Sequence, residues 1–276
     1  MTIRYNVHGV RFSIDADGPL AATIADAVMP ASVRAGRSAP GETAFAVRRE
    51  GRRLRVDRGR RRLWDVSSEG ELIPWLESEI VAWLLKKLRR YVPLHAAVAA
   101  RRGRAVLLPG GPDAGKTSMA CALALAGWAV MSDEVALVEP RALTVASFPR
   151  RMFVDAGTAR RLPPLRGITP RRVTLERGRV SVRYVHPEFA GARIPDRAGI
   201  AALAFPEWSR RSSVSPMGER EALERLLGTL FNADRRPRPA VETCVKLVRN
   251  TPRFRLHIGK LGEAAFRLSE AVEAEQ

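Results

Sequence analysis

Gly110-Gly111-Pro112-Asp113-Ala114-Gly115-Lys116-Thr117 has the spacing of a phosphate-binding P-loop, with glycines at both ends and Lys-Thr after the last one. Glycine is needed there because the backbone turns sharply and points successive N–H groups at phosphate oxygens. An apolar run at residues 105–108 precedes the loop, and a helical pattern at residues 116–126 follows it and stops at Gly127. The stretch therefore predicts a strand, a phosphate-binding turn and a helix in direct succession.

The residue types of this loop predict how it would hold a nucleoside triphosphate. The helix after the loop adds the partial positive charge of its N-terminus. Lys116 is expected to reach the β- and γ-phosphates, and the hydroxyl of Thr117 to bind Mg²⁺. The alternative is a glycine turn with no ligand. We expect ATP and Mg²⁺ as cofactors, with the nucleotide held by Gly110, Gly111, Pro112, Asp113, Ala114, Gly115, Lys116, Thr117 and Ser118.

Two adjacent acids, Asp133 and Glu134, follow the next apolar strand, which is predicted at residues 128–131. Their position at the C-terminal edge of a sheet is where ligands gather in open α/β folds. A carboxylate there can hold Mg²⁺ or accept the proton of an attacking hydroxyl. The alternative is a structural pair that caps the turn. Only residues 118–132 separate Thr117 from Asp133, whereas in many P-loop ATPases another strand intervenes.

Three stretches together resemble the catalytic core of HPr kinase/phosphorylase. They are residues 106–117, residues 124–134 and Leu94-His95-Ala96-Ala97, which places a histidine on the strand before the P-loop strand. The resemblance covers residues 92–149. It implies an α/β fold with an HPr kinase/PEP carboxykinase-like P-loop core and a mixed sheet. The sequence departs from the family in two places, because Glu134 replaces an aspartate and Ala96 replaces a glycine.

The same resemblance implies roles for particular residues. Asp133 would be the catalytic base toward a serine hydroxyl, and His95 and Lys116 would complete the catalytic group. The metal ligands would be Thr117, Asp133 and Glu134. The sequence is also similar to the divergent HPr kinase-related proteins of bacterial peptide-modification clusters, which implies serine phosphorylation of ribosomally synthesised precursor peptides, lasso peptides among them.

The hydrophobic pattern predicts two domains. Residues 1–91 indicate a small α+β unit that would bind substrate or act as a lid, with strands at 3–7, 10–14, 44–47 and 54–56, a loop at 30–43 and a connector helix at 68–90. Residues 92–276 would form the catalytic domain. Beyond the acids we expect a hairpin of 135–138 with 143–148, strands at 200–205 and 254–258, and helices at 220–232, 240–248 and 262–272.

The charge balance is strongly basic, with a formal net charge of +18. Lys86, Lys87, Lys116, Lys246 and Lys260 are the only lysines among 47 basic residues, so nearly all of this charge is arginine. Either a GC-rich genome or attraction of an acidic partner explains such a bias. The arginine-dense residues 48–62 are correspondingly either a solvated hairpin or a binding surface for an acidic peptide. No RRM, KH or zinc-finger pattern is present, which makes nucleic acid an unfavoured partner.

The sequence also bears on the compartment and the assembly of the protein. No apolar run approaches the roughly 20 residues that cross a bilayer, and the N-terminus shows no signal peptide. These features predict a cytoplasmic protein without a membrane partner, and they are compatible with a homo-oligomer. Cys121 and Cys244 lie in or beside apolar helical patterns, which predicts buried free thiols. Arg150 and Arg151 could clamp a phosphate, although a structural role is favoured.

Three functions are compatible with these residues. The first is an ATP- and Mg²⁺-dependent kinase that phosphorylates a serine of a peptide or protein. The second retains this chemistry but transfers the phosphoryl group to the hydroxyl of a small metabolite. The third is a nucleotide-binding regulatory module with slow or no turnover. The paired acids so soon after the P-loop argue against the third, whereas the net charge of +18 suits it.

Overall fold

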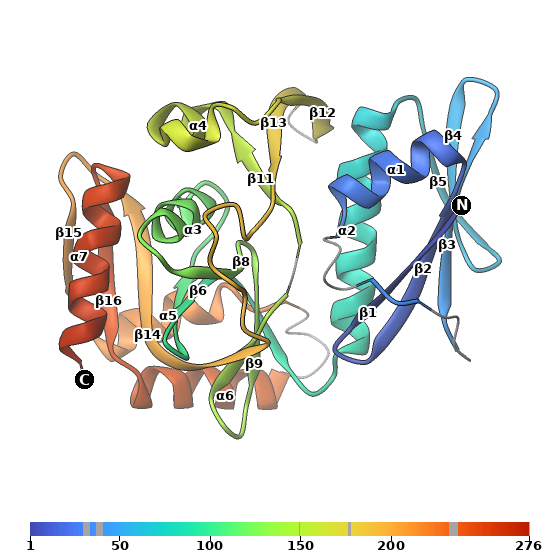
Figure 1. Ribbon diagram of the computed structural model, residues 1–276. Coiled ribbons are helices and arrows are strands. Elements are labelled where there is room, and N and C mark those ends of the chain that lie inside the picture. The colour runs from blue at the N-terminus through green and yellow to red at the C-terminus, as the bar shows by residue number, and fades with distance from the viewer. Residues whose placement is uncertain (30–33, 37–40, 149, 176–177, 232–236, 276) are drawn as a thin grey trace. The chain divides into compact units, whose positions relative to one another are not determined.

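The computed structural model describes residues 1–276 except 30–33, 37–40, 149, 176–177, 232–236 and 276 (Figure 1). The chain clusters into two compact units. The first unit comprises Met1–Leu88, Pro149–Ala156 and Ile168–Tyr184, and the second comprises Arg89–Phe148, Gly157–Gly167 and Val185–Gln276. Two later segments of the chain therefore pack with its N-terminal part.

A five-stranded sheet in the order β1-β2-β3-β4-β5 forms the first unit's main layer (Figure 1). Its strands are β1 (Thr2–Val7), β2 (Val10–Ala16), β3 (Thr43–Glu50), β4 (Arg53–Arg58) and β5 (Arg61–Val66). Only the β2–β3 pair is parallel, and the intervening chain contains α1 (Gly18–Ala27). The strands predicted at 3–7, 10–14, 44–47 and 54–56 are all present. The predicted loop at 30–43 lies largely outside the described residues.

Helix α2 (Glu69–Lys87) covers this sheet with an aromatic side chain. The ring of Trp83 lies 5.9 Å from that of Phe12 and 5.8 Å from that of Phe45, both edge-on. Edge-to-face pairs of this kind add to the stabilisation from burial alone. The helix begins as its sequence predicts, because Ser68 accepts a hydrogen bond from the backbone N–H of Glu71 at its N-cap.

A second, three-stranded sheet in the order β11-β13-β12 is not foreseen by the sequence pattern. Its strands are β11 (Met152–Asp155), β12 (Arg171–Leu175) and β13 (Gly178–Val185). Strands β11 and β12 are short, most residues of β12 are exposed and the first half of β13 is exposed, so their apolar alternation is weak. Helix α2 approaches β12 so closely that a Cβ on Gly70 would lie 2.8 Å from the carbonyl oxygen of Arg172.

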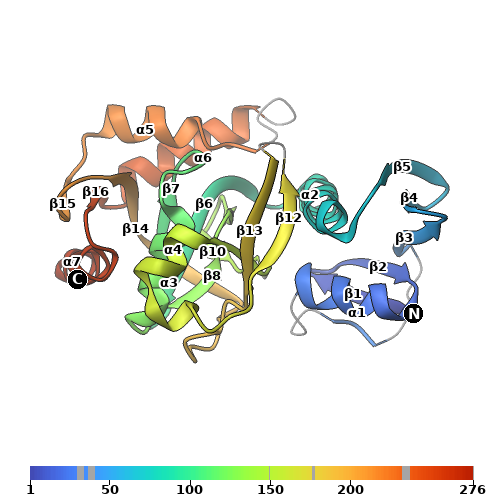
Figure 2. The ribbon, with the colours of Figure 1, turned by 90° about the horizontal axis from the view of Figure 1, so that it is seen from above.

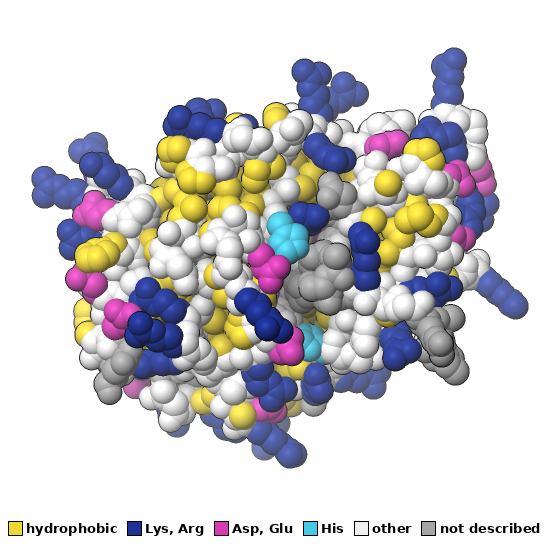
Figure 3. Space-filling model, in the orientation of Figure 1, with side chains coloured by type: hydrophobic (Ala, Val, Ile, Leu, Met, Phe, Trp, Pro, Cys, Tyr) yellow, Lys and Arg dark blue, Asp and Glu magenta, His cyan; other side chains and the backbone are white. Residues whose placement is uncertain are grey.

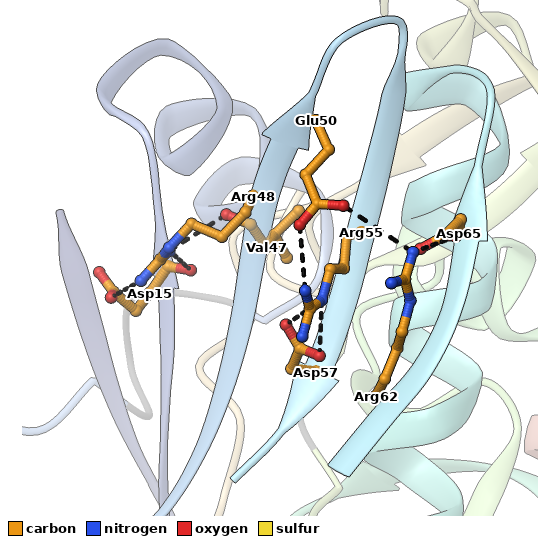
Figure 4. Close-up of polar contacts among 8 residues, drawn as sticks. All are labelled: Asp15, Val47, Arg48, Glu50, Arg55, Asp57, Arg62 and Asp65. Carbon is orange, nitrogen blue, oxygen red and sulfur yellow. Dashed lines mark hydrogen bonds and ion pairs between the residues drawn. The ribbon is translucent and has the colours of Figure 1, made fainter. Parts of the chain in front are cut away.

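Ion pairs neutralise much of the arginine-rich hairpin between residues 48 and 62 (Figure 4). Arg55 donates to the carboxylates of Glu50 and Asp57, at 3.0 and 2.9 Å. Arg62 pairs with Asp65 at 2.5 Å, and Arg48 pairs with Asp15. Exposed pairs of this type add little stability individually. Their main consequence is that fewer of these arginines carry unbalanced charge than the sequence suggests.

The second unit is built on a mixed sheet in the order β10-β9-β6-β7-β14-β16-β15, with β8 paired to β6. Strand β14 is parallel to both β7 and β16, whereas β6 is antiparallel to β7, β8 and β9. The strands are β6 (Val92–Arg101), β7 (Arg104–Pro109), β8 (Ala129–Ser132), β9 (Val135–Glu139), β10 (Thr144–Ala146), β14 (Arg197–Trp208), β15 (Ser213–Pro216) and β16 (Arg253–Ile258).

Helices cover both faces of this sheet. Figure 2 shows α5 (Glu219–Leu227) and α6 (Pro237–Asn250) on one side, and α3 (Lys116–Leu125) and α7 (Leu261–Ala274) on the other. Buried aliphatic residues of β6, β7 and β14 form one core with Leu226 of α5 and Leu247 of α6. On the opposite side, the indole N–H of Trp128 donates to Ser269 Oγ of α7 over 2.9 Å.

Helix α5 is shorter in the structure than the sequence pattern predicts. The helix expected at 220–232 ends at Leu227, with Gly228 at its C-cap. The residues after it form backbone bonds to β6 instead, since the N–H of His95 donates to the carbonyl of Thr229 over 2.7 Å and that of Phe231 to the carbonyl of Pro93 over 3.1 Å. Tertiary pairing thus overrides local helix propensity. Residue 232 lies outside the described residues.

Within the described part of the chain, no helix is long and apolar enough to cross a membrane. Both cysteines are free and buried, as predicted.

Burial also lowers the reactivity of the Cys244 thiol. Desolvation raises the pKa of Cys244 to about 12. Because only the thiolate is nucleophilic, we expect iodoacetamide at about pH 8 to leave Cys244 unmodified in the folded protein and to label it after unfolding in guanidinium chloride. Mass spectrometry of the two samples tests this expectation. Rapid labelling of Cys244 in the folded protein would contradict it.

Candidate active site

The loop between β7 and α3 contains two residues with positive φ. Gly115 lies in the left-handed region with φ of 95°, and Asp113 has φ of 61°. Gly115 is the N-cap residue of α3 and has no side chain with which to cap this end of the helix. The first N–H groups of a helix have no partner within it. They are therefore a donor set suited to an anion at this end of the loop.

Gly115 is also required by close packing. A Cβ at this position would lie 2.9 Å from Ile258 Cδ1 and 3.3 Å from Trp208 Cε2. The end of the loop is thus pressed against the ends of β14 and β16.

We expect Gly115→Ala to destabilise the protein and distort the loop. A left-handed conformation costs an alanine about 1–2 kcal/mol, and the crowded Cβ adds to this. Urea unfolding should therefore show a lower midpoint. Gly262→Ala is the matched control, since its Cβ meets nothing within 4 Å and it lies inside α7; it should be neutral or slightly stabilising. Equal midpoints for the two variants would refute the argument.

Lys116 is buried beside the loop. Its Nζ donates to the carbonyl oxygen of Gly111 over 2.7 Å, which folds the side chain back over the loop. Burial lowers the pKa of Lys116 to about 8, and the carboxylates of Asp133 and Asp113 partly oppose that shift. A desolvated ammonium gains much from an added negative charge. The position suits a phosphate group between the loop amides and Nζ.

Thr117 and Asp133 meet at the same place. The hydroxyl of Thr117 donates to Asp133 Oδ2 over 3.1 Å, and Asp133 is 4% exposed. Ser132 holds the turn that carries Asp133, because its Oγ accepts from the backbone N–H of Glu134 at 3.3 Å and of Val135 at 2.9 Å. A hydroxyl and a carboxylate at this distance are oxygen donors of the kind that Mg²⁺ prefers. The residues present therefore fit a magnesium-bound triphosphate.

His95 lies within β6, and Glu134 lies in the turn between β8 and β9, next to the residue that pairs with His95. His95 Nε2 is 4.0 Å from Glu134 Oε1. The carbonyl of His95 accepts a hydrogen bond from the N–H of Gly110 at 3.3 Å, which ties β6 to the start of the loop. The His95 ring also lies 5.4 Å from that of Phe231. The structure thus brings His95 and Glu134 together beside the loop, with the Glu134 side chain partly exposed.

Ser118, the last residue predicted to contact the nucleotide, directs its side chain elsewhere. Its Oγ is 2.6 Å from Thr158 Oγ1, and both groups are buried. Thr158 lies in α4 (Ala156–Arg161). The hydroxyl of Ser118 therefore holds α3 against α4, and the group of Ser118 best suited to a phosphate is its backbone N–H.

A cavity of about 540 Å³ that the sequence analysis did not foresee lies beside the loop. Residues 109–114 of the loop form one wall, and the end of β14 with α5 and the residues after it forms the others: Phe205, Pro206, Glu207, Trp208, Glu224, Arg225, Gly228 and Thr229. Trp208 donates from its indole N–H to the carbonyl of Asp113 over 3.1 Å. No local pattern marks Trp208, since an aromatic residue at the end of an apolar strand is common.

Arg150 has a structural partner. Its Nε donates to Glu77 Oε1 over 2.8 Å, and both side chains are 4% exposed. The guanidinium also lies over the ring of Phe153, 5.3 Å from its centroid. The structural role weighed for Arg150 is therefore the one that its contacts support.

The fold and this site define a mixed α/β protein with a glycine loop, a buried lysine and an acid-bearing turn at one sheet edge. No family model matches the chain, and no curated protein matches its sequence. Among solved structures, the chain is similar to the HPr(Ser) kinase/phosphatase from Coxiella burnetii, with 11% identity and a TM-score of 0.33 over 67% of this chain and 99% of that one.

Proposed function

We propose that this protein is an ATP- and Mg²⁺-dependent kinase, similar to HPr kinase, that transfers the γ-phosphoryl group to a serine hydroxyl of a peptide or protein. The observation that carries the proposal is the 3.1 Å contact between Thr117 Oγ1 and Asp133 Oδ2, directly beside buried Lys116. A hydroxyl, a carboxylate and a lysine at the end of one glycine loop form the set that phosphoryl transfer requires.

Binding of the triphosphate would involve the loop amides, Lys116 and Thr117. The ammonium of Lys116 would bridge the β- and γ-phosphates, and the N-terminus of α3 would face the same groups. Magnesium ion, when bound by Thr117, Asp133 and Glu134, would neutralise the phosphate charge. Such a site works by positioning and charge stabilisation, because phosphoryl transfer needs little covalent help from the protein.

Asp133 would act as the base of the transfer step. The serine Oγ forms a bond to the γ-phosphorus, the bond between that phosphorus and the bridging oxygen of ADP breaks, and the serine proton passes to the Asp133 carboxylate. His95, held beside the loop by its own carbonyl, would bind the transferred phosphoryl group. The burial of Asp133, which is 4% exposed, would limit the access of water that competes with the serine hydroxyl.

The acceptor proposed here is a peptide with acidic character, such as a ribosomally synthesised precursor peptide. The net charge of +18 supports such a partner. Figure 3 shows arginine and lysine side chains spread over the face of the molecule that is in view. Arg48, Arg55 and Arg62 are engaged in ion pairs. The acidic peptide would therefore be attracted by the net positive charge of the whole protein rather than by one cluster of arginines. A cytoplasmic location, where ATP is supplied, belongs to the same proposal.

The test is transfer of label from γ-labelled ATP with Mg²⁺. Acceptors are acidic peptides with one serine, the same peptides with alanine in its place, and small hydroxyl compounds such as free serine and glycerol. We expect label on the serine peptides alone, and none when EDTA removes magnesium. Label only on a small compound would replace the proposal with a metabolite kinase. No label on any acceptor, despite ATP binding, would favour a regulatory nucleotide-binding module.

A further inference from the structure

Trp208 is an exposed aromatic side chain held against the glycine loop. It is 43% exposed although it ends the long, mostly buried strand β14. Its indole N–H donates to the carbonyl of Asp113, and its ring edge meets Gly115. The guanidinium of Arg161 lies over the ring, 5.0 Å from its centroid. These contacts set the orientation of the ring while leaving part of its surface available to a ligand.

The exposed part of Trp208 contributes to the cavity beside the loop. That cavity, of about 540 Å³, is within the range of small-ligand sites. Its walls combine apolar and polar groups, because Phe205 and Pro206 lie beside the ion pair between Glu207 and Arg225. A flat aromatic ligand with polar edges suits such a lining.

The sheet order determines where this cavity lies relative to the acids. The loop follows β7, whose neighbours are β6 on one side and β14 on the other. Asp133 follows β8, which pairs with β6, whereas Trp208 ends β14. A triphosphate that lies along the loop with its γ end toward Asp133 therefore directs its other end toward Trp208.

We propose that the cavity binds the nucleoside end of the nucleotide, with the ring of Trp208 stacked on a purine base. This inference rests on the proposed function, since it requires a triphosphate in the loop. Stacking on one aromatic ring tolerates adenine and guanine alike, because every base has a π-face. The cavity would thus add affinity for nucleotide over inorganic polyphosphate.

Calorimetric titration of the full chain with Mg²⁺ and either ATP or inorganic tripolyphosphate separates base binding from phosphate binding. Four proteins are compared: wild type, Trp208→Ala, Trp208→Phe and Trp75→Ala. Trp208→Phe retains a stacking ring but loses the hydrogen bond to Asp113. Trp75 is the matched control, because it is 45% exposed and lies in the other unit.

We expect Trp208→Ala to weaken ATP binding by about 5- to 150-fold, the range that loss of one base–aromatic stack produces. Its tripolyphosphate affinity should stay at the wild-type value, and Trp208→Phe and Trp75→Ala should bind ATP within about threefold of wild type. Equal weakening of both ligands by Trp208→Ala would overturn the inference, since Trp208 would then only support the loop. Equal affinity of wild type for ATP and tripolyphosphate would overturn it while leaving the proposed function intact. Binding of neither ligand would overturn both.

Discussion

Asp133→Asn should reduce the rate of phosphoryl transfer by about three orders of magnitude, the upper part of the range for loss of a general base. The amide keeps the size of the side chain, and its carbonyl oxygen can still accept the hydrogen bond that Thr117 donates over 3.1 Å to Asp133 Oδ2. An asparagine cannot take up the serine proton at neutral pH. The fall should therefore appear in kcat, measured with γ-labelled ATP and the best acceptor peptide.

Binding and folding controls distinguish a lost base from a damaged site. The ATP dissociation constant of Asp133→Asn, measured by calorimetry, should remain within about one order of magnitude of the wild-type value, because Lys116 and the loop amides still hold the phosphates. Asp17→Asn, an exposed position at the start of α1, should leave kcat unchanged. Near wild-type turnover by Asp133→Asn would show that another group accepts the proton, and Glu134 would be the next residue to test.

Glu77→Gln should lower the free energy of unfolding by about 3–5 kcal/mol. The substitution removes the charge that balances Arg150, whose side chain is only 4% exposed and 2.8 Å from Glu77 Oε1. A buried guanidinium without its counter-charge bears the full cost of desolvation. The pair joins α2 to the segment that contains β11, so the loss should destabilise the first unit. Urea unfolding followed by tryptophan fluorescence measures the effect.

Two further variants test whether burial of the ion pair is the reason for the expected loss of stability in Glu77→Gln. Glu242→Gln removes one partner of the Arg238–Glu242 pair, whose side chains are 89% and 55% exposed, and should change stability by less than about 0.5 kcal/mol. The double variant Glu77→Leu with Arg150→Met should recover much of the lost stability, because apolar groups of similar size need no charge partner. A Glu77→Gln protein within about 1 kcal/mol of wild type would refute the argument.

Much of the fold could be predicted where the signal is local. The hydrophobic periodicity places strands β1 to β4 of the first sheet, α2 with its Ser68 cap, and the strand, loop and helix around Lys116, all of which appear in the structure; β5 was not predicted. The β11-β13-β12 sheet could not be predicted in this way, because β11 and β12 are short and much of β12 and β13 is exposed. The early end of α5 also depends on pairing with β6, which no local propensity encodes.

The features of the candidate site likewise separate into those that depend on local sequence and those that depend on long-range contacts. By itself, the sequence determined the strand, glycine loop and helix around Lys116 and the position of the two acids after β8, because tight turns and capping depend on residues close together in the chain. Tertiary structure alone decided that Trp208 lies against Asp113, 95 residues away, and that Arg150 pairs with Glu77, 73 residues away. Such contacts follow from which strands become neighbours in a sheet. That choice is made by packing of the whole unit, since the pattern of a single strand does not specify its partners.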